Sequence, residues 1–179
     1  RRSVMGFFDK VLGKPAGGSS PVDRGDFRAH EAPQKGFSMA VPQDWIVAED
    51  PDGLETHPKE CARVADPASS RAISSPGARV TISDVAEPRQ NVVKETIRTR
   101  STAMTGHRMV RHIAGDVKNA DFGIVYEYQY GPPESPIRAL GIVAQKKNRL
   151  FTVSASGSAQ DFEKNRGILE AIITSFKLH

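Results

Sequence analysis

The chain has 179 residues, of which 38% are hydrophobic and 26% are charged, and its formal net charge is +4. This composition is typical of a globular protein and excludes a fibrous or largely disordered chain. The single cysteine, Cys61, excludes an intramolecular disulfide and a thiolate metal cluster, and the apolar runs are too short to span a bilayer, so we expect only peripheral contact with a membrane.

The beginning of the chain contains one apolar helical stripe. Its five residues fall at positions i, i+3, i+4, i+7 and i+8, and they are Val4, Phe7, Phe8, Val11 and Leu12. Ser3 can cap the predicted helix and Gly13 can end it. A helix of about ten residues is only marginally stable in water. The stripe therefore needs a surface to pack on, either on its own domain or on a partner.

A polar segment follows this stripe. Residues from Lys14 to Lys35 include the run Gly17-Gly18-Ser19-Ser20-Pro21 and very few apolar side chains, which predicts a flexible linker. We therefore predict two parts of the chain. Residues 1–35 form a flexible N-terminal arm with a short amphipathic helix, and residues 36–179 form a folded domain.

The first half of the domain alternates between strand and helix patterns. Phe37–Val41 alternates as a half-buried strand that ends at Pro42. The segment from Pro51 to Pro76 contains four prolines and is predicted to be irregular. Arg79–Val85 is predicted to be a strand, and Gln90–Met104 has the apolar spacing of a helix. Met109 to Ile113 can form a short strand.

The second half of the domain predicts three strands in series. Phe122–Tyr130 alternates over nine residues, Ile137–Gln145 returns after a Pro-Pro loop, and Leu150–Ala155 follows a tight turn. Three such strands form an antiparallel meander.

The last predicted element is a helix, and its position helps to define the fold class. Ser158 and Asp161 have the spacing of a capping box ahead of a helix over Gln160–Ser175. Helices and strands are partly segregated along the chain. This order predicts an α+β sandwich, an antiparallel sheet with flanking helices, and argues against a Rossmann-type alternation.

Motifs for catalysis or metal binding are missing from the sequence. There is no Gly-rich phosphate loop and no nucleophile elbow. The acidic turn around Gly53 resembles a calcium loop, but its first and last ligand positions fall on Ala48 and Lys59, so a solvated turn is favoured. His107 and His112 have the wrong spacing for a helical zinc site. We therefore predict no catalytic residue, no metal ligand and no enzymatic activity.

One segment, from Glu87 to Lys118, has an excess of positive charge. Three acidic residues stand against seven basic ones, which are Arg89, Lys94, Arg98, Arg100, Arg108, Arg111 and Lys118. No aromatic platform accompanies them, which argues against nucleic acid. The segment is either a solvated helix face or a surface that docks on an acidic protein. Arg98 and Arg100 are the predicted docking residues on the helix.

Several of these segments together resemble the PsbP family. The resemblance covers the domain from Gly36 onward and adds one stretch of the arm. It is carried by Gly36–Trp45 (G-F-S-M-A-V-P-Q-D-W), Tyr126–Tyr130, Arg138–Ala144, Arg149–Val153, Ile172–Phe176 and, in the arm, Val11–Pro15 (V-L-G-K-P).

The resemblance implies a fold and a function. The fold is the PsbP-like α-β-α sandwich. The function is that of an extrinsic subunit of photosystem II in the chloroplast thylakoid lumen, with membrane subunits and other extrinsic subunits as partners. The arm supports calcium and chloride retention at the manganese–calcium cluster, and the chain binds no cofactor directly. Homologous domains leave two alternatives, a PsbP-like assembly factor or a small-ligand or protein-binding module.

Two positions depart from the family pattern. Arg138 stands where the family often has a histidine, and Ser158 stands where it has an aspartate. Since a guanidinium cannot bind a divalent cation, the surface metal site linked to these positions is disfavoured, while Arg138 can still dock. The docking residues that we predict are Val4, Phe7, Phe8, Val11, Leu12, Lys14, Arg98, Arg100 and Arg138.

Overall fold

The computed structural model describes residues 27–49, 59–67, 75–86 and 90–179. The predicted arm helix and the first part of the predicted linker, residues 1–26, lie outside these ranges. In the part of the chain that is described, no helix is long and apolar enough to cross a membrane.

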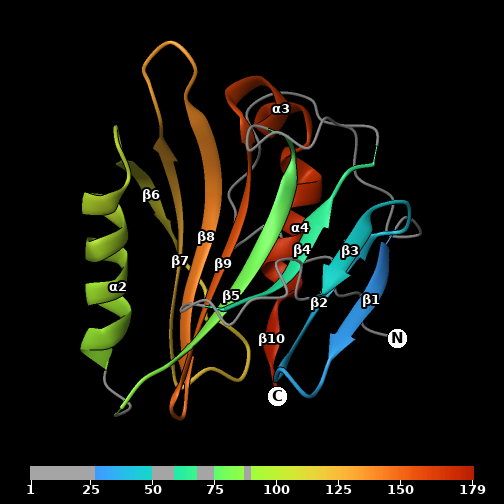
Figure 1. Ribbon diagram of the computed structural model, residues 1–179, viewed down its shortest axis with the longest axis vertical. Coiled ribbons are helices and arrows are strands. Elements are labelled where there is room, and N and C mark those ends of the chain that lie inside the picture. Colours follow the sequence, from blue (N-terminus) through green and yellow to red (C-terminus); the bar gives the residue numbers. More distant parts are fainter. Residues whose placement is uncertain (1–26, 50–58, 68–74, 87–89) are drawn as a thin grey trace.

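A large antiparallel sheet forms the centre of the fold (Figure 1). Its seven strands lie in the order β3-β4-β5-β9-β8-β7-β6, so the predicted meander is present as the neighbours β7, β8 and β9. The strands are β3 (Ile46–Glu49), β4 (Lys59–Ala65), β5 (Gly77–Asp84), β6 (Arg108–Ile113), β7 (Phe122–Tyr130), β8 (Ile137–Lys146) and β9 (Arg149–Ser158).

A smaller sheet and three helices complete the described structure. The smaller sheet has the order β1-β2-β10, with β1 (Phe27–Ala32), β2 (Phe37–Pro42) and β10 (Lys177–Leu178). The helices are α2 (Gln90–Ala103), α3 (Ala159–Lys164) and α4 (Arg166–Ser175).

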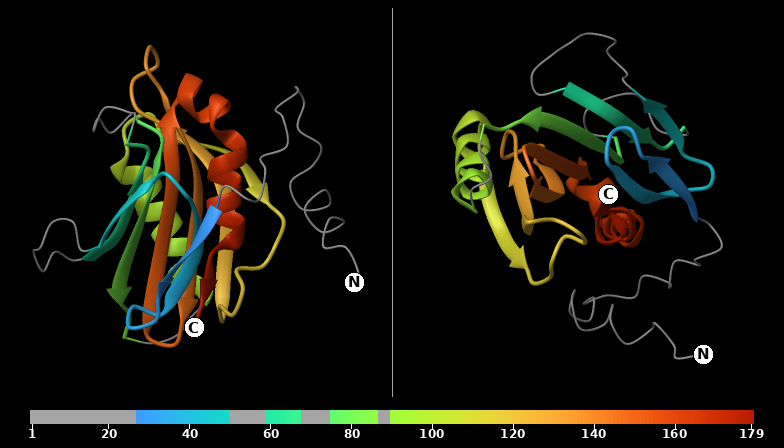
Figure 2. Two further views of the ribbon diagram at one scale, coloured as in Figure 1. Left: turned by 90° about the vertical axis from the view of Figure 1, so that its right-hand side faces the viewer. Right: turned by 90° about the horizontal axis from the view of Figure 1, so that it is seen from below.

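The helices lie on opposite faces of the large sheet (Figure 2). Helix α2 packs on β7 and β8 from one side, and α4 packs on the other side, between the large sheet and β2. Antiparallel strands with helices on both sides confirm the predicted α+β class.

Each face of the large sheet has its own apolar core. The core on the α4 side is the larger and includes Phe37, Phe151 and Phe176, whose rings pack together. The core on the α2 side is smaller, and Val93 and Ile97 of the helix pack there on the sheet. Burial of these side chains holds the helices to the sheet, because each buried apolar side chain stabilises the fold by roughly 1.5–3 kcal/mol.

Most predicted strands and the first helix are confirmed. The predicted Phe122–Tyr130 strand is β7 over its full length, and the predicted helix Gln90–Met104 corresponds to α2. The predicted strand Phe37–Val41 is β2, but it belongs to the smaller sheet rather than to the sheet that holds the meander.

The predicted linker differs from the structure over β1. The prediction assigned Lys14–Lys35 to a linker, whereas Phe27–Ala32 pairs with β2. The two buried residues of β1 are His30 and Ala32, so the strand has no run of large apolar side chains that would predict it. Pairing with β2 through a tight turn at Gly36, where φ is +84°, forms the strand instead.

The last predicted helix is two helices in the structure. Helices α3 and α4 meet at Asn165, which ends α3 and whose backbone N–H donates to the carbonyl oxygen of Asp161. The predicted cap at Ser158 is confirmed, since its hydroxyl accepts a hydrogen bond from the Asp161 N–H at 3.1 Å. The Asp161 carboxylate accepts from the Ser158 hydroxyl at 2.7 Å, and not from the Ser158 backbone N–H as in a full capping box.

Candidate docking surface

The outer face of α2 carries exposed basic residues. Val93 and Ile97 are buried against the sheet at the i, i+4 spacing of one helix face. Lys94 and Arg98 each follow one of these residues by one position and are exposed. Among the described residues, neither basic side chain has an ion-pair partner. Arg98 therefore lies where a partner can reach it, and its docking role stays a prediction.

Arg100, the second docking residue predicted on α2, lies on the inner side of the helix. It is only partly exposed, and its Nε atom is buried without a hydrogen-bond partner. Burial lowers the pKa of His107, and the Arg100 charge lowers it further. Burial raises the pKa of Tyr126 and of Tyr130, and the Arg100 charge partly opposes both rises. Arg100 therefore faces an aromatic group on the sheet.

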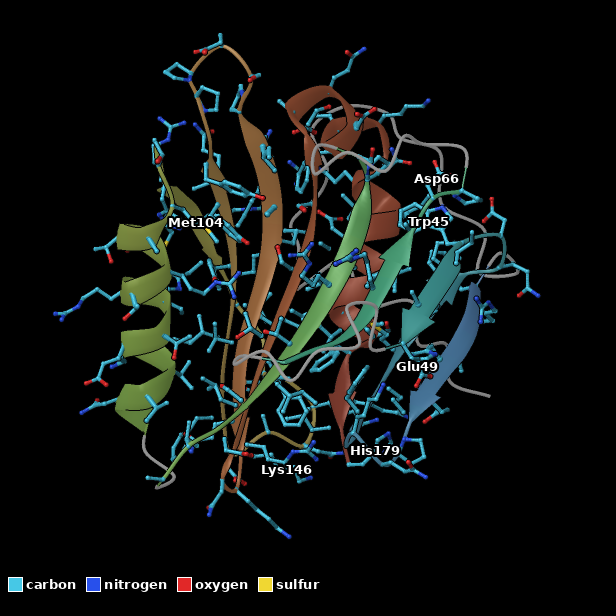
Figure 3. The ribbon with its side chains drawn as sticks, in the orientation of Figure 1. Trp45, Glu49, Asp66, Met104, Lys146 and His179 are labelled. Carbon is cyan, nitrogen blue, oxygen red and sulfur yellow. The ribbon has the colours of Figure 1, made fainter. Side chains whose placement is uncertain are left out.

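This aromatic group is a row of stacked tyrosines on β7. The ring centroids of Tyr126 and Tyr128 are 5.1 Å apart, and those of Tyr128 and Tyr130 are 5.9 Å apart. The ring of His107 stacks on Tyr128 at 5.4 Å. Met104, just after the end of α2, lies between the helix and the sheet beside this row (Figure 3).

Small residues on β8 let the tyrosine rings lie across the sheet. Gly141 pairs with Tyr126 in the register, and a Cβ atom at Gly141 would lie 2.8 Å from the Cζ atom of Tyr126. The rings therefore reach over β8 toward β9. There the hydroxyl groups of Tyr128 and Ser154 are hydrogen-bonded at 2.8 Å.

The opposite face of β7 holds a charged network around Glu127. Side chains alternate along a strand, so Glu127 points away from the tyrosines, and its side chain is only 1% exposed. Its carboxylate accepts hydrogen bonds from Arg111 Nε at 2.9 Å, from Arg138, and from Arg166 Nη2 at 3.2 Å. We call this set the glutamate-centred network, and its members are Arg111, Glu127, Arg138, Glu163, Arg166 and Glu170.

Arg138, which was predicted to dock the domain, is part of this network. Its guanidinium donates to Glu127 and to Glu163, and it lies 5.1 Å from the ring centroid of Phe162. Arg166 lies over the same ring at 4.9 Å. The Arg138 side chain is 24% exposed. Its visible contacts are therefore within the domain, and its docking role stays a prediction.

The network shifts the pKa values of its carboxyl groups in different directions. Burial raises the pKa of Glu127, but the hydrogen bonds and charges of Arg166, Arg111 and Arg138 outweigh burial, and the net shift is downward. A hydrogen bond from Arg166 lowers the pKa of Glu163. Burial raises the pKa of Glu170. The central carboxylate is therefore stabilised in its charged form.

The sequence prediction did not identify this network. Glu127 alternates with the tyrosines of β7, and this pattern alone places it on the opposite face of the strand. The arginines that surround it come from β6, β8 and α4, and Arg166 is 39 residues away along the chain. Their convergence depends on the strand order, which the sequence pattern did not specify.

The other predicted residues are placed only in part. Val4, Phe7, Phe8, Val11, Leu12 and Lys14 lie outside the described residues, as does the side chain of Cys61. His112 is exposed on β6. Across the described ranges, no group of three or more His, Cys, Asp or Glu side chains is arranged to hold a metal ion.

Comparisons with known proteins give a family and a fold. The model of the PsbP family matches residues 25–178. No curated protein matched the sequence. Among solved structures, cyanobacterial PsbP (CyanoP) from Synechocystis sp. PCC 6803 has 14% sequence identity and a TM-score of 0.56, and the match covers 93% of this chain and 100% of CyanoP.

Two further solved structures come from bacteria. LpqN of Mycobacterium tuberculosis, described as involved in cell envelope biogenesis, has 10% identity and a TM-score of 0.60, covering 85% of this chain and 91% of LpqN. PA94 of Pseudomonas aeruginosa, a protein of unknown function, has 11% identity and a TM-score of 0.50, covering 83% of this chain and 94% of PA94. At these identities the likeness establishes a shared fold.

Proposed function

Since the chain belongs to the PsbP family, we propose that it is a non-catalytic docking protein that binds an acidic protein surface through the outer face of α2. The observation that carries this proposal is the exposure of Lys94 and Arg98 on that face, with no ion-pair partner among the described residues. Cations of this kind steer a protein toward an acidic partner and fix its orientation.

In its specific form, the proposal makes the chain an extrinsic subunit of photosystem II. It would dock on the lumenal face in the chloroplast thylakoid lumen, beside the membrane subunits and other extrinsic subunits. The family match and the resemblance of Val11–Pro15 to the family's arm support this form. The arm would favour retention of calcium and chloride at the manganese–calcium cluster of the photosystem, and the chain itself would supply no ligand.

A second candidate is a binding module of the same fold that acts outside photosynthesis. The likeness of the fold to LpqN of M. tuberculosis favours this candidate, because one fold can carry unrelated functions. A third possibility is a PsbP-like assembly factor, which would bind a photosystem only transiently and would not be a permanent subunit.

Binding to photosystem II membranes separates the two candidates. The full chain is added to membranes that concentrated salt has stripped of extrinsic proteins, and the bound fraction is measured against ionic strength. We expect binding at low salt and release as salt rises, because exposed charges are screened over about 10 Å near 0.1 M salt. Absence of binding at low salt would contradict the photosystem form and leave the second candidate.

A charge reversal on α2 tests the surface itself. Arg98→Glu should lower the salt concentration at which the chain is released. Lys164→Glu, which reverses an exposed charge on α3, is the matched control and should leave the release unchanged. Equal effects of the two variants would mean that net charge alone, and not the face of α2, controls binding.

Deletion of the arm tests its separate role. Removal of residues 1–14 should leave the thermal stability of the domain unchanged, because the stripe orders on the partner. The truncated chain should still bind photosystem II but should support oxygen evolution only when calcium and chloride are in excess. A lower melting temperature would instead place the stripe on its own domain.

A further inference from the structure

Arg100 and the tyrosine row lie beside a polar strip on the α2 side of the large sheet. In the register, Tyr126, Gly141 and Ser154 are paired across β7, β8 and β9, and Arg79 of β5 pairs with Ser154. In the next row, Ser156 of β9 pairs with Ala139 of β8. The glycine and the alanine leave room for the rings, and the Tyr128 hydroxyl lies 2.8 Å from the Ser154 hydroxyl on β9. The ring of Tyr130 stacks on that of Tyr128, so the same lean directs its hydroxyl toward Ser156, two residues further along β9.

The polar groups of this strip can reach solvent. Contacts between α2 and the large sheet are mainly with β7 and β8. Tyr130, Ser154 and Ser156 are each partly exposed, and Arg79 is exposed. A small molecule can therefore approach the hydroxyl groups beside the helix.

The charges around the strip favour an anion. Burial raises the pKa of Tyr130, and the positive charges of Arg79 and Arg100 both oppose this rise. The Arg100 Nε–H is a buried donor without an acceptor. Among the described residues, no carboxylate forms an ion pair with Arg100. A buried donor that lacks an acceptor costs about 1–3 kcal/mol, and an anion in this position would remove that cost.

We propose that Arg100, Tyr130 and Ser156 form a binding site for a small oxyanion, a phosphate or a carboxylate, on the α2 side of the sheet. The guanidinium supplies charge and a fork of donors, which suits the two oxygens of such a group. The hydroxyls of Tyr130 and Ser156 supply further donors. The site is separate from the outer face of α2 and does not rest on the proposed docking function.

The site can be tested on the full chain with inorganic phosphate as the probe. Backbone amide shifts are followed by NMR during titration with phosphate at constant ionic strength. We expect saturable shifts at Arg100, Tyr130 and Ser156. A linear drift without saturation would rule out phosphate as the ligand and leave only a carboxylate to be tested.

Two arginine variants on the same helix give a matched comparison. Arg100→Met keeps the aliphatic stem but removes the charge, and it should weaken phosphate binding about tenfold or more, as expected for the loss of a charge-assisted hydrogen bond. Arg98→Met removes a charge from the outer face of α2 and should change the affinity less than twofold. Equal losses in both variants would overturn the site, since they would show binding by net charge alone.

Two milder variants test the site even if Arg100→Met does not fold. Tyr130→Phe keeps the ring and its stacking and should weaken binding a few-fold through loss of the hydroxyl. If Arg100→Met does not fold, Arg100→Lys keeps the charge and should bind severalfold more weakly than the unchanged chain. Unchanged affinity in both Tyr130→Phe and Arg100→Lys would contradict the assignment.

A second titration with acetate identifies the kind of oxyanion. Tighter saturation by phosphate than by acetate would assign the site to phosphate groups, and the reverse order would assign it to carboxylates. Absence of saturation with both probes would overturn the proposal.

Discussion

Two groups of arginines lie on opposite faces of the large sheet, and their surroundings differ. On the α4 side, Arg111, Arg138 and Arg166 surround the buried carboxylate of Glu127. On the α2 side, Arg100 lies beside tyrosine hydroxyls and has no ion-pair partner among the described residues. The first arrangement satisfies its charges within the fold. The second leaves the buried Nε–H of Arg100 without an acceptor.

This difference indicates that the arginines on the α4 side stabilise the fold, whereas Arg100 on the α2 side is available for binding. The buried carboxylate and its three guanidiniums connect β6, β7, β8 and α4. Loss of one partner would leave the charge of the remaining groups uncompensated and would destabilise the fold. An arginine without a carboxylate partner contributes little to the stability of the fold. Such an arginine can therefore bind a ligand without a cost to the stability of the fold.

The largest expected effect is at the centre of the glutamate-centred network. Glu127→Gln keeps the size of the side chain but removes its charge, which leaves three guanidiniums close together. We expect a loss of about 3 kcal/mol in the free energy of unfolding, at the lower end for a broken buried ion pair because the arginines stay partly solvated. Urea denaturation measures this loss.

A variant of an exposed network member is the control for this prediction. The Glu163 side chain is 49% exposed, so Glu163→Gln should cost about 1 kcal/mol or less. If Glu127→Gln lowers the free energy of unfolding no more than Glu163→Gln does, the network does not stabilise the fold. The two faces of the sheet would then not differ in the role of their arginines.

The next effect concerns the tyrosine row. Gly141→Ala would place a methyl group 2.8 Å from Tyr126 and 3.1 Å from Tyr128, so both rings must move. Overpacking of this kind costs about 1–3 kcal/mol. Phosphate binding should weaken as well, because the hydroxyl groups shift with the rings.

Gly157→Ala is the matched control for the tyrosine row. Gly157 also lies in the large sheet, but its added Cβ would meet its nearest neighbours at 3.4 Å or more. Urea denaturation and phosphate titration of the two variants are compared. Equal costs would show that the effect comes from replacing any glycine of the large sheet, and not from crowding of the tyrosine rings.

The sequence predicted one of these faces better than the other. Alternation over β7 predicted the strand and the common face of the tyrosines, and the helical spacing of α2 predicted the helix above them. The arginines around Glu127 come from three separate elements, and periodicity gives no information on which elements become neighbours. The strand β1 was missed for a related reason, since its buried residues, His30 and Ala32, give no strong apolar pattern.

The segment that was predicted to be irregular, Pro51 to Pro76, contains a strand. Strand β4 lies between Pro58 and Pro67, within a segment that its prolines predicted to be irregular. The prolines flank the strand and do not interrupt its ladder, and β4 pairs with β5 through a bulge at Glu60 and Ala62. Pairing with a neighbour that is far along the chain decided the structure here, as it did for β1.

Acidification should weaken the glutamate-centred network. The pKa of Glu127 is lower in the folded protein than the value of about 4.3 in an unfolded chain. A carboxyl group of this kind contributes stability above the unfolded pKa and loses it as the pH falls through the folded pKa. The pKa of Glu163 is lowered as well and acts in the same direction, whereas the raised pKa of Glu170 acts in the opposite one.

Unfolding at several pH values measures this linkage. The free energy of unfolding of the unchanged chain should fall as the pH drops below about 4.3. Glu127→Gln should reduce the slope, because one of the titrating groups is absent. An equal slope in the two proteins would show that Glu127 has the same pKa in the folded and unfolded states.

The smallest expected effect on stability is at Arg98, and it completes the comparison of the two faces. Arg98 is exposed and has no ion-pair partner within the described ranges, so Arg98→Ala should change the free energy of unfolding by less than about 0.5 kcal/mol. Arg138→Ala removes two ion pairs and a contact with Phe162, and it should destabilise the domain measurably. Binding to photosystem II membranes should show the reverse order, with the larger loss in Arg98→Ala. If Arg138→Ala reduces binding more than Arg98→Ala while the domain stays folded, docking occurs on the α4 side, and the network has a second role there.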